Sequence, residues 1–159
     1  MKKVIVLSGV SGSGKSFFAA KIMREMRERD KTGYEEYSKV SADDYFTDEN
    51  GRYIFNAAML GEAHNECFRA FLWDMQQDKN NLIIVDNTNC SNEEIAPYMR
   101  AGRAFGYDCE IMTVVTENLA ACAARNSHGV PLSSIQEQYK RLINRKLLPW
   151  WKSSEVSFS

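Results

Sequence analysis

The sequence has no long hydrophobic run; its apolar residues come instead in short groups. No stretch approaches the roughly 20 apolar residues of a membrane-spanning helix. The apolar run after Met1-Lys2-Lys3 is also too short for the core of a secretory signal. The sequence also has no excess of charge of one sign, because its 20 Lys and Arg nearly balance its 21 Asp and Glu, for a net charge of -1. We therefore expect a cytoplasmic protein with no membrane partner and no basic field over the whole surface.

Cysteine and histidine are scarce and scattered. The four cysteines form no C-x-x-C pair, and the two histidines add no cluster at zinc-ligand spacing. A disulfide framework and a structural zinc site are therefore not indicated. With 159 residues, 44% of them hydrophobic and 26% charged, the chain has the composition of one ordinary globular domain. We expect that domain to cover residues 1–159.

Short apolar or β-branched runs alternate with helical patterns along the chain. Strands are expected at about 3–8, 36–41, 82–87 and 109–115, and helices at about 15–29, 56–78, 92–105, 117–125 and 132–146. This alternation is typical of βαβ units. It predicts an α/β fold with a parallel sheet of four to five strands and helices on both faces. The serine-rich end gives no signal.

The most specific motif is GVSGSGKS at residues 9–16, which follows the apolar run 4–7. Between a strand and a helix, this pattern is a P-loop. Its backbone N–H groups bind phosphate oxygens, its lysine reaches the β- and γ-phosphates, and its serine hydroxyl binds Mg²⁺. We therefore expect a P-loop NTPase that binds ATP and Mg²⁺ through Gly9, Ser11, Gly12, Ser13, Gly14, Lys15 and Ser16.

Acidic residues follow two other predicted strands. Ligands of open parallel sheets bind at the carboxyl ends of the strands, so these residues are expected near the P-loop. Asp43 is the candidate base for an acceptor hydroxyl, and Asp44 a second candidate for substrate contact. Asp86 stands where a Walker-B carboxylate would, and is assigned with Ser16 to the metal.

The residues after Asp86 allow two interpretations. Asn87 and Asn89 are candidates for substrate binding, but their side chains would equally well hold the turn that ends the strand.

Residues 120–146 are expected to form a helical lid. A helix ends at Arg125 and another begins after Pro131, with Gly129 between them. Arg125, at the hinge, is the candidate cation that contacts ATP and neutralises the transition state. His128 is explained as well by a local hydrogen bond as by catalysis.

A basic stretch near the end of the chain is also open to two interpretations. Lys140, Arg141, Arg145 and Lys146, with Trp150 and Trp151 close by, would suit a nucleic-acid backbone and its bases. A solvated helix face is the alternative.

Three segments together resemble one group of P-loop kinases, which contains phage polynucleotide kinase and the kinase-like domain of NEDD4-binding protein 2. They are GVSGSGKS at 9–16, SADDYF at 41–46, and IIVDNTN at 83–89 with ARNSHGVP at 124–131. The resemblance implies ATP-dependent phosphorylation of a nucleic-acid hydroxyl, usually a 5′ end. It also implies that Lys15 and Ser16 bind phosphate and magnesium, that Asp43 is the general base, and that Arg125 contacts ATP.

The sequence departs from that family at two acceptor-side positions. Where polynucleotide kinases tend to have arginine, this chain has Ala42 and Phe46. Phe46 is therefore a candidate to stack on a base. This arrangement would suit the hydroxymethyl group of a modified pyrimidine in DNA, which related phage enzymes phosphorylate.

Three functions remain open at this point. A nucleic-acid acceptor, expected to be DNA, is favoured over a free nucleoside, nucleotide or other small molecule. A non-catalytic ATP-binding module is the third possibility.

Overall fold

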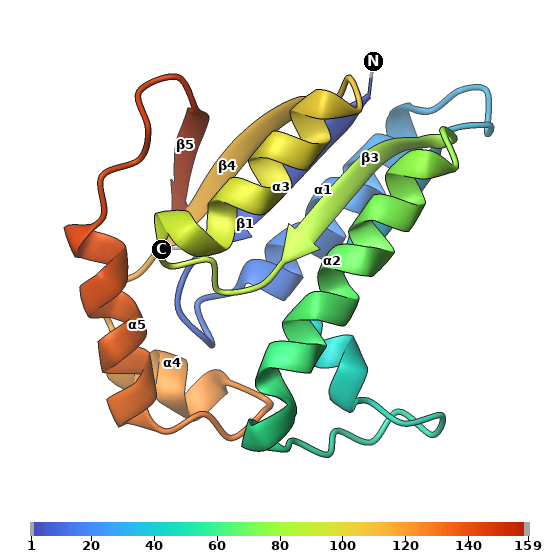
Figure 1. Cartoon of the computed structure of the whole chain (residues 1–159). Coiled ribbons are helices and arrows are strands. Elements are labelled where there is room, and N and C mark those ends of the chain that lie inside the picture. The colour runs from blue at the N-terminus through green and yellow to red at the C-terminus, as the bar shows by residue number, and fades with distance from the viewer. Residues whose placement is uncertain (1, 158–159) are drawn as a thin grey trace.

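The computed structural model describes residues 2–157 and has a five-stranded parallel sheet in the order β2-β3-β1-β4-β5 (Figure 1). The strands are β1 (Lys3–Ser8), β2 (Glu36–Val40), β3 (Asn80–Asp86), β4 (Asp108–Val115) and β5 (Lys152–Ser157). The α-helices are α1 (Lys15–Arg29), α2 (Leu60–Gln76), α3 (Asn92–Ala104), α4 (Leu119–Arg125) and α5 (Leu132–Asn144). Two 3₁₀ turns, η1 (Ala42–Phe46) and η2 (Ala57–Met59), lie between β2 and α2.

Helices cover both faces of the sheet, as the sequence predicts. The side chains of α2 and α3 pack on one face, with Val4, Val6, Ile83 and Val85 among the buried strand residues. Helix α1 packs on the other face, over Ile5, Leu7, Leu82 and Ile84. Because β1 and β3 are covered on both sides, their sequences are continuous apolar runs rather than alternating ones.

Several element boundaries differ from expectation. The predicted helix 56–78 begins as η2, and α2 proper starts at Leu60. The last helix ends at Asn144 rather than 146, because Arg145 adopts an extended conformation. The tail forms β5, which the sequence does not reveal because its side chains are mostly exposed and polar. Residues 158–159 of the serine-rich end lie outside the described part of the chain.

Helices α4 and α5 lie at the carboxyl end of the sheet, beside the P-loop (Figure 1). Buried Val10 of the P-loop packs with Cys122 of α4 and Ile135 of α5. The fold thus brings the predicted lid against the loop that is predicted to hold phosphate. None of the helices within residues 2–157 has the length and apolar character to cross a membrane.

Candidate active site

The P-loop makes a close turn between β1 and α1. Gly14 has a φ of 104° and caps α1, and Gly12 has a φ of 78°. A Cβ atom on Gly12 would lie 2.1 Å from the carbonyl oxygen of Cys122. Glycine is therefore required at residue 12 both by the left-handed backbone and by the close approach of α4.

Lys15, the first residue of α1, is buried beneath the P-loop. Its Nζ donates a hydrogen bond of 2.8 Å to the carbonyl oxygen of Val10. Burial lowers the pKa of Lys15, an effect that the negative charge of Asp86 opposes. An anionic phosphate entering the loop would stabilise the charged form of this amine.

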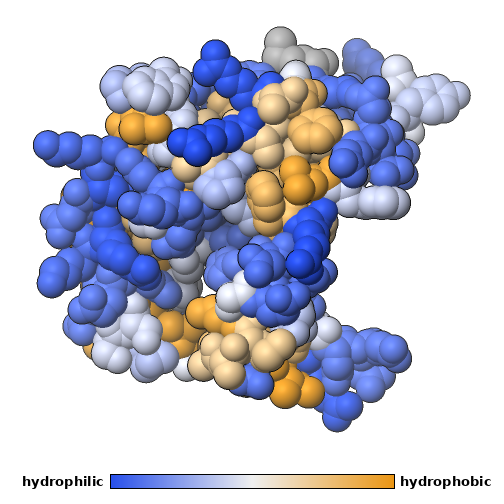
Figure 2. Space-filling model, viewed as in Figure 1, coloured by the Kyte–Doolittle hydropathy of each residue, from blue (hydrophilic) through white to orange (hydrophobic). Residues whose placement is uncertain are grey.

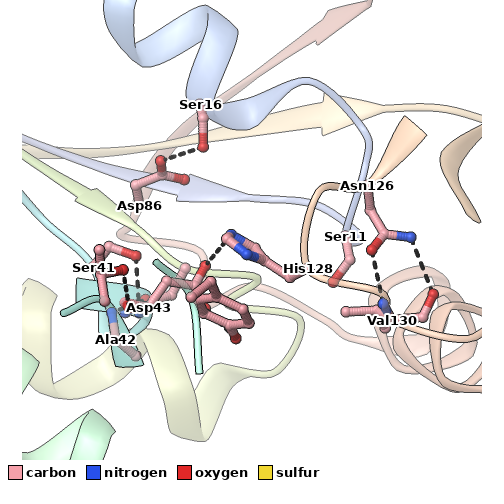
Figure 3. Close-up of polar contacts among 12 residues, drawn as sticks. Ser11, Ser16, Ser41, Ala42, Asp43, Asp86, Asn126, His128 and Val130 are labelled. Carbon is pink, nitrogen blue, oxygen red and sulfur yellow. Dashed lines mark hydrogen bonds and ion pairs between the residues drawn. The ribbon is translucent and has the colours of Figure 1, made fainter. Parts of the chain in front are cut away.

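Ser16 and Asp86 form the oxygen pair of a possible magnesium site. The Ser16 hydroxyl donates to Oδ2 of Asp86 at 2.8 Å (Figure 3), and Nζ of Lys39 lies 3.7 Å from the same oxygen. No group of three or more His, Cys, Asp and Glu side chains suited to a metal occurs within residues 2–157. Mg²⁺ commonly binds through one or two protein oxygens plus phosphates and water, so the Ser16–Asp86 pair fits this ion.

Asp43 lies at the start of η1, opposite the lid. The Ser41 side chain accepts a hydrogen bond from the Asp43 amide and so caps this turn. The Tyr53 hydroxyl donates to Oδ1 of Asp43 at 3.3 Å. On the other oxygen, Nε2 of His128 lies 3.3 Å from Oδ2 (Figure 3). The carboxylate is thus contacted by the segment after β2 and by the loop between α4 and α5.

The lid also contacts the P-loop directly. Nε of Arg125, the last residue of α4, donates a hydrogen bond of 3.0 Å to the carbonyl oxygen of Gly12. Gln138 of α5 accepts from the Ser11 amide at 2.9 Å, and its Nε2 lies 3.2 Å from the Ser11 hydroxyl. These contacts place a cation and an amide beside the predicted phosphate site.

Two adjoining hollows meet at Asp43 and His128. The first, of about 270 Å³, lies over the P-loop; we call it the donor hollow, and its lining includes Lys15, Ser16, Asp86 and Arg125. The second, of about 420 Å³, we call the acceptor hollow; it lies between η1, α2 and α5, and its lining includes Tyr53, Phe55, His64 and Arg141. A group in either hollow would have access to the Asp43 carboxylate.

The structure gathers most of the predicted site residues around the donor hollow. Those that line it are Ser11, Gly12, Gly14, Lys15, Ser16, Asp43, Asp86, Asn87 and Arg125. Gly9 and Ser13 lie in the P-loop but outside both linings. Asp44 is exposed and lines neither hollow, and the charge of Lys39 acts on its carboxylate from nearby.

Two predicted substrate contacts have structural surroundings instead. Phe46 is only 6% exposed, and its ring packs edge-on against Tyr53 and Phe55 in the core. Its faces are covered, which corrects the expectation that it presents a stacking surface; Tyr53 and Phe55 line the acceptor hollow in its place. Asn89 is 2% exposed, and its side chain donates to the Leu7 carbonyl oxygen at 2.8 Å, so it holds the turn.

Asn87 lines both hollows, but its side chain already has partners. Oδ1 accepts from the Ala42 amide at 2.8 Å, and Nδ2 donates to Sγ of Cys67 at 3.4 Å. This asparagine therefore ties η1 to the end of β3 and to α2.

The basic stretch of α5 and the following loop divides into different environments. Lys140 and Lys146 are exposed, whereas Arg145 turns inward to the ends of β1 and β4. Arg141 lines the acceptor hollow, and its Nη1 lies 3.7 Å from Oε1 of Glu94. Hydrophilic residues predominate on the side of the molecule formed by α5 (Figure 2).

Sequence reasoning missed Lys39, Tyr53, Asn126 and Gln138, and left the role of His128 open. Lys39 lies near the carboxyl end of β2, where a polar residue is a detectable signal. Tyr53 lies in an irregular segment, Asn126 in a loop and Gln138 on a helix, and no motif or periodicity predicts their contacts with the site.

A family model and a known protein match this sequence over most of its length. The family model described as "AAA domain" matches residues 4–130. Human NEDD4-binding protein 2 is 34% identical over 151 residues, which is 89% of this chain and 8% of that protein. The chain thus spans less than a tenth of that relative's length.

Solved structures share the fold at low sequence identity. Chaetomium thermophilum Kti12 in complex with ADP-AlF₃ has a TM-score of 0.66 and 14% identity, over 98% of this chain and 88% of that one. A chain of the Pnkp1/Rnl/Hen1 RNA repair complex has a TM-score of 0.65 and 17% identity, over 89% of this chain and 44% of that one. A Sinorhizobium meliloti gluconokinase has a TM-score of 0.62 and 15% identity, over 98% of this chain and 82% of that one.

The match of the family model extends from β1 through the P-loop, Asp43 and Asp86 to the loop that carries His128. It covers most of the residues that line the donor hollow. On this basis, the chain belongs to the AAA domain family, with an α/β fold that it shares with the solved structures above.

Proposed function

We propose that this protein transfers the γ-phosphate of ATP to a hydroxyl of a nucleic acid. The acceptor would be a polynucleotide 5′-hydroxyl or the hydroxymethyl group of a modified pyrimidine in DNA. The observation that carries the proposal is the position of Asp43, whose carboxylate lies where the donor and acceptor hollows meet. A carboxylate at such a junction suits a base that accepts a proton during transfer between the two.

The reaction that this geometry supports is an in-line displacement. The acceptor O–H bond breaks and its proton passes to Asp43, while the acceptor oxygen forms a bond to the γ-phosphorus. The bond between that phosphorus and the bridging oxygen breaks, and ADP leaves with both bonding electrons. Lys15 and Arg125, which both line the donor hollow, neutralise the charge on the phosphates. Mg²⁺ held by Ser16 and Asp86 would add further neutralisation.

The lining of the acceptor hollow favours a nucleic acid over a small polar molecule. Tyr53 and Phe55 lie with their rings nearly parallel, 6.3 Å apart, and Phe55 is 51% exposed. Arg141 and His64 add cationic or polar groups to the same lining. Aromatic rings next to cations suit a base and the phosphate attached to it. A chain of the Pnkp1/Rnl/Hen1 RNA repair complex shares the fold, which supports this choice.

A small-molecule acceptor is the second candidate. The acceptor hollow, at about 420 Å³, is of a size that suits a metabolite, and a gluconokinase shares the fold.

One experiment distinguishes these functions. The protein is incubated with γ-labelled ATP and 5′-hydroxyl DNA, 5′-hydroxyl RNA, DNA that contains hydroxymethyluracil, free nucleosides or gluconate. We expect label in a nucleic acid, and label only in a small molecule would favour the second candidate. Intact ATP binding with no labelled acceptor would indicate a non-catalytic ATP-binding module. Asp43→Asn is expected to abolish transfer while ATP still binds; transfer that survives would remove Asp43 as the base.

A further inference from the structure

The loop between α4 and α5 is held in one conformation by Asn126. Nδ2 of this residue donates to the carbonyl oxygens of Ala123 and Val130 at 2.8 and 3.0 Å, and its Oδ1 accepts from the Val130 amide at 2.7 Å. Gly129, with a φ of 69°, supplies the left-handed position of the turn. The result is a closed loop with His128 at its tip, on the side that faces η1 (Figure 3).

This loop joins the two halves of the candidate site within four residues. Arg125 at its start contacts the P-loop carbonyl of Gly12, and His128 contacts Asp43. This segment contacts the P-loop at one end and Asp43 at the other, so it links the position of the P-loop to that of the carboxylate. A movement of this segment together with the end of α4 would disturb both contacts.

Asp43 needs such support because its side chain is half exposed. Of the two side chains in this contact, 49% of the Asp43 side-chain surface and 35% of the His128 side-chain surface are exposed. An exposed carboxylate rotates readily unless both oxygens are held. Here Tyr53 holds Oδ1 and His128 holds Oδ2. The two rings also contact each other, with centroids 4.0 Å apart, so each restrains the other.

We propose that His128 is a positioning residue for the reaction, which holds the Asp43 carboxylate toward the acceptor hollow when the α4–α5 loop is docked. His128 makes this contact from the lid, whereas Tyr53 makes it from the body of the protein. Docking of the lid on the P-loop would therefore also fix the base. The inference rests on the proposed function, because it assigns a role in the orientation of the Asp43 base.

The first test measures transfer by two variants at residue 128. His128→Ala removes the donor, and His128→Gln keeps an N–H donor of similar reach. With the acceptor that the wild type labels best, we expect His128→Ala to lower kcat roughly 10- to 100-fold, as for a misplaced catalytic group. The KM for ATP should change less than about twofold, and His128→Gln should recover part of kcat. Melting temperatures identify any variant that is merely unfolded.

The second test observes the contact without any reaction. The chain has two histidines, so the His128 ring signal in a ¹H–¹³C NMR spectrum is assigned with His64→Gln. We expect Asp43→Asn to shift this signal, whereas Asp44→Asn, one residue away, should leave it in place.

The outcomes separate the two proposals. A wild type that labels no acceptor would remove the proposed function, while the NMR comparison would still decide the His128–Asp43 contact. A wild type that transfers phosphate, together with an unchanged kcat in His128→Ala, would overturn only the role of His128. The same conclusion follows if kcat and the melting temperature fall together and His128→Gln restores neither, or if Asp43→Asn leaves the His128 signal unmoved.

Discussion

Arg145 is expected to stabilise the fold rather than to bind nucleic acid. Its Nη1 donates to the Ser8 hydroxyl at 2.6 Å and to the Asn89 carbonyl oxygen at 2.8 Å, and its Nη2 donates to the Thr113 hydroxyl at 2.8 Å. Ser8 ends β1, Asn89 follows β3, and Thr113 lies within β4 near its carboxyl end. The guanidinium group of Arg145 therefore joins the end of α5 to the carboxyl end of the sheet, where the P-loop lies.

The size of the effect follows from these three bonds. A hydrogen bond from a charged donor contributes about 1.5–3 kcal/mol when buried. Because Arg145 is only partly buried, we take about 1 kcal/mol for each bond, or about 3 kcal/mol in total. Arg145→Met keeps most of the side-chain length and loses all three. In a chain of this size, a loss of about 3 kcal/mol corresponds to a decrease of about 6–12 °C in melting temperature.

Thermal and urea unfolding followed by circular dichroism measure this loss. Lys146→Met is the matched control, because the Lys146 side chain is next to Arg145 in the sequence and exposed. This substitution should change the free energy of unfolding by less than about 0.5 kcal/mol. A melting temperature of Arg145→Met within about 2 °C of the wild type, where about 6–12 °C is expected, would refute the reasoning. If that variant instead lost affinity for oligonucleotides at full stability, the interpretation of the basic stretch as a nucleic-acid surface would be correct for Arg145.

Two further changes test the P-loop and the surroundings of Asp43. Gly12→Ala should weaken ATP binding about tenfold or more, a cost of roughly 1.4 kcal/mol, because its Cβ would lie 2.1 Å from the Cys122 carbonyl oxygen. Gly33→Ala has a similar φ of 70° and open space, so calorimetry should find its ATP affinity unchanged; equal losses in both variants would contradict the steric reason. Burial, reinforced by Asp43, raises the pKa of Tyr53 from 10.0 to about 12. The neutral phenol therefore stabilises the fold below pH 10, and this contribution is lost as the pH rises toward 12. The free energy of unfolding, measured with urea across that pH range, should fall less steeply for Tyr53→Phe than for the wild type. Identical slopes of this free energy against pH would contradict the raised pKa of Tyr53.

Much of the fold is visible in the sequence because the central strands are buried on both faces. The runs in β1 and β3 are apolar since α1 covers one side of the sheet and α2 and α3 cover the other. Strand β5 was missed for the opposite reason. It pairs through its backbone with β4 alone, at the edge of the sheet, and only Val156 among its residues is partly buried. Backbone pairing of this kind leaves no apolar pattern to detect.

The donor side could be predicted for a related reason. Lys15, Asp43 and Asp86 follow strands that are neighbours in the sheet, so their proximity follows from the topology of parallel strands. Tyr53 and His128 could not be placed in this way. They are 75 positions apart in the numbering and come from two irregular segments, and only the packing of α4 and α5 on the P-loop brings them together.

The buried environment of η1 gives a physical reason for the two departures from the polynucleotide kinase pattern. Ala42 is 5% exposed and Phe46 is 6% exposed, and both pack in the core beneath α2. An arginine at either position would have to bury its charge or break this packing, each of which is costly. Any phosphate of an acceptor would therefore meet a cation elsewhere, and in the acceptor hollow that cation is Arg141 of α5. Because α5 also holds the Ser11 amide through Gln138, the element that supplies the acceptor's cation is the same one that rests on the P-loop. If the proposed function is correct, recognition of the acceptor would thus depend on the lid more than on the segment that carries Asp43.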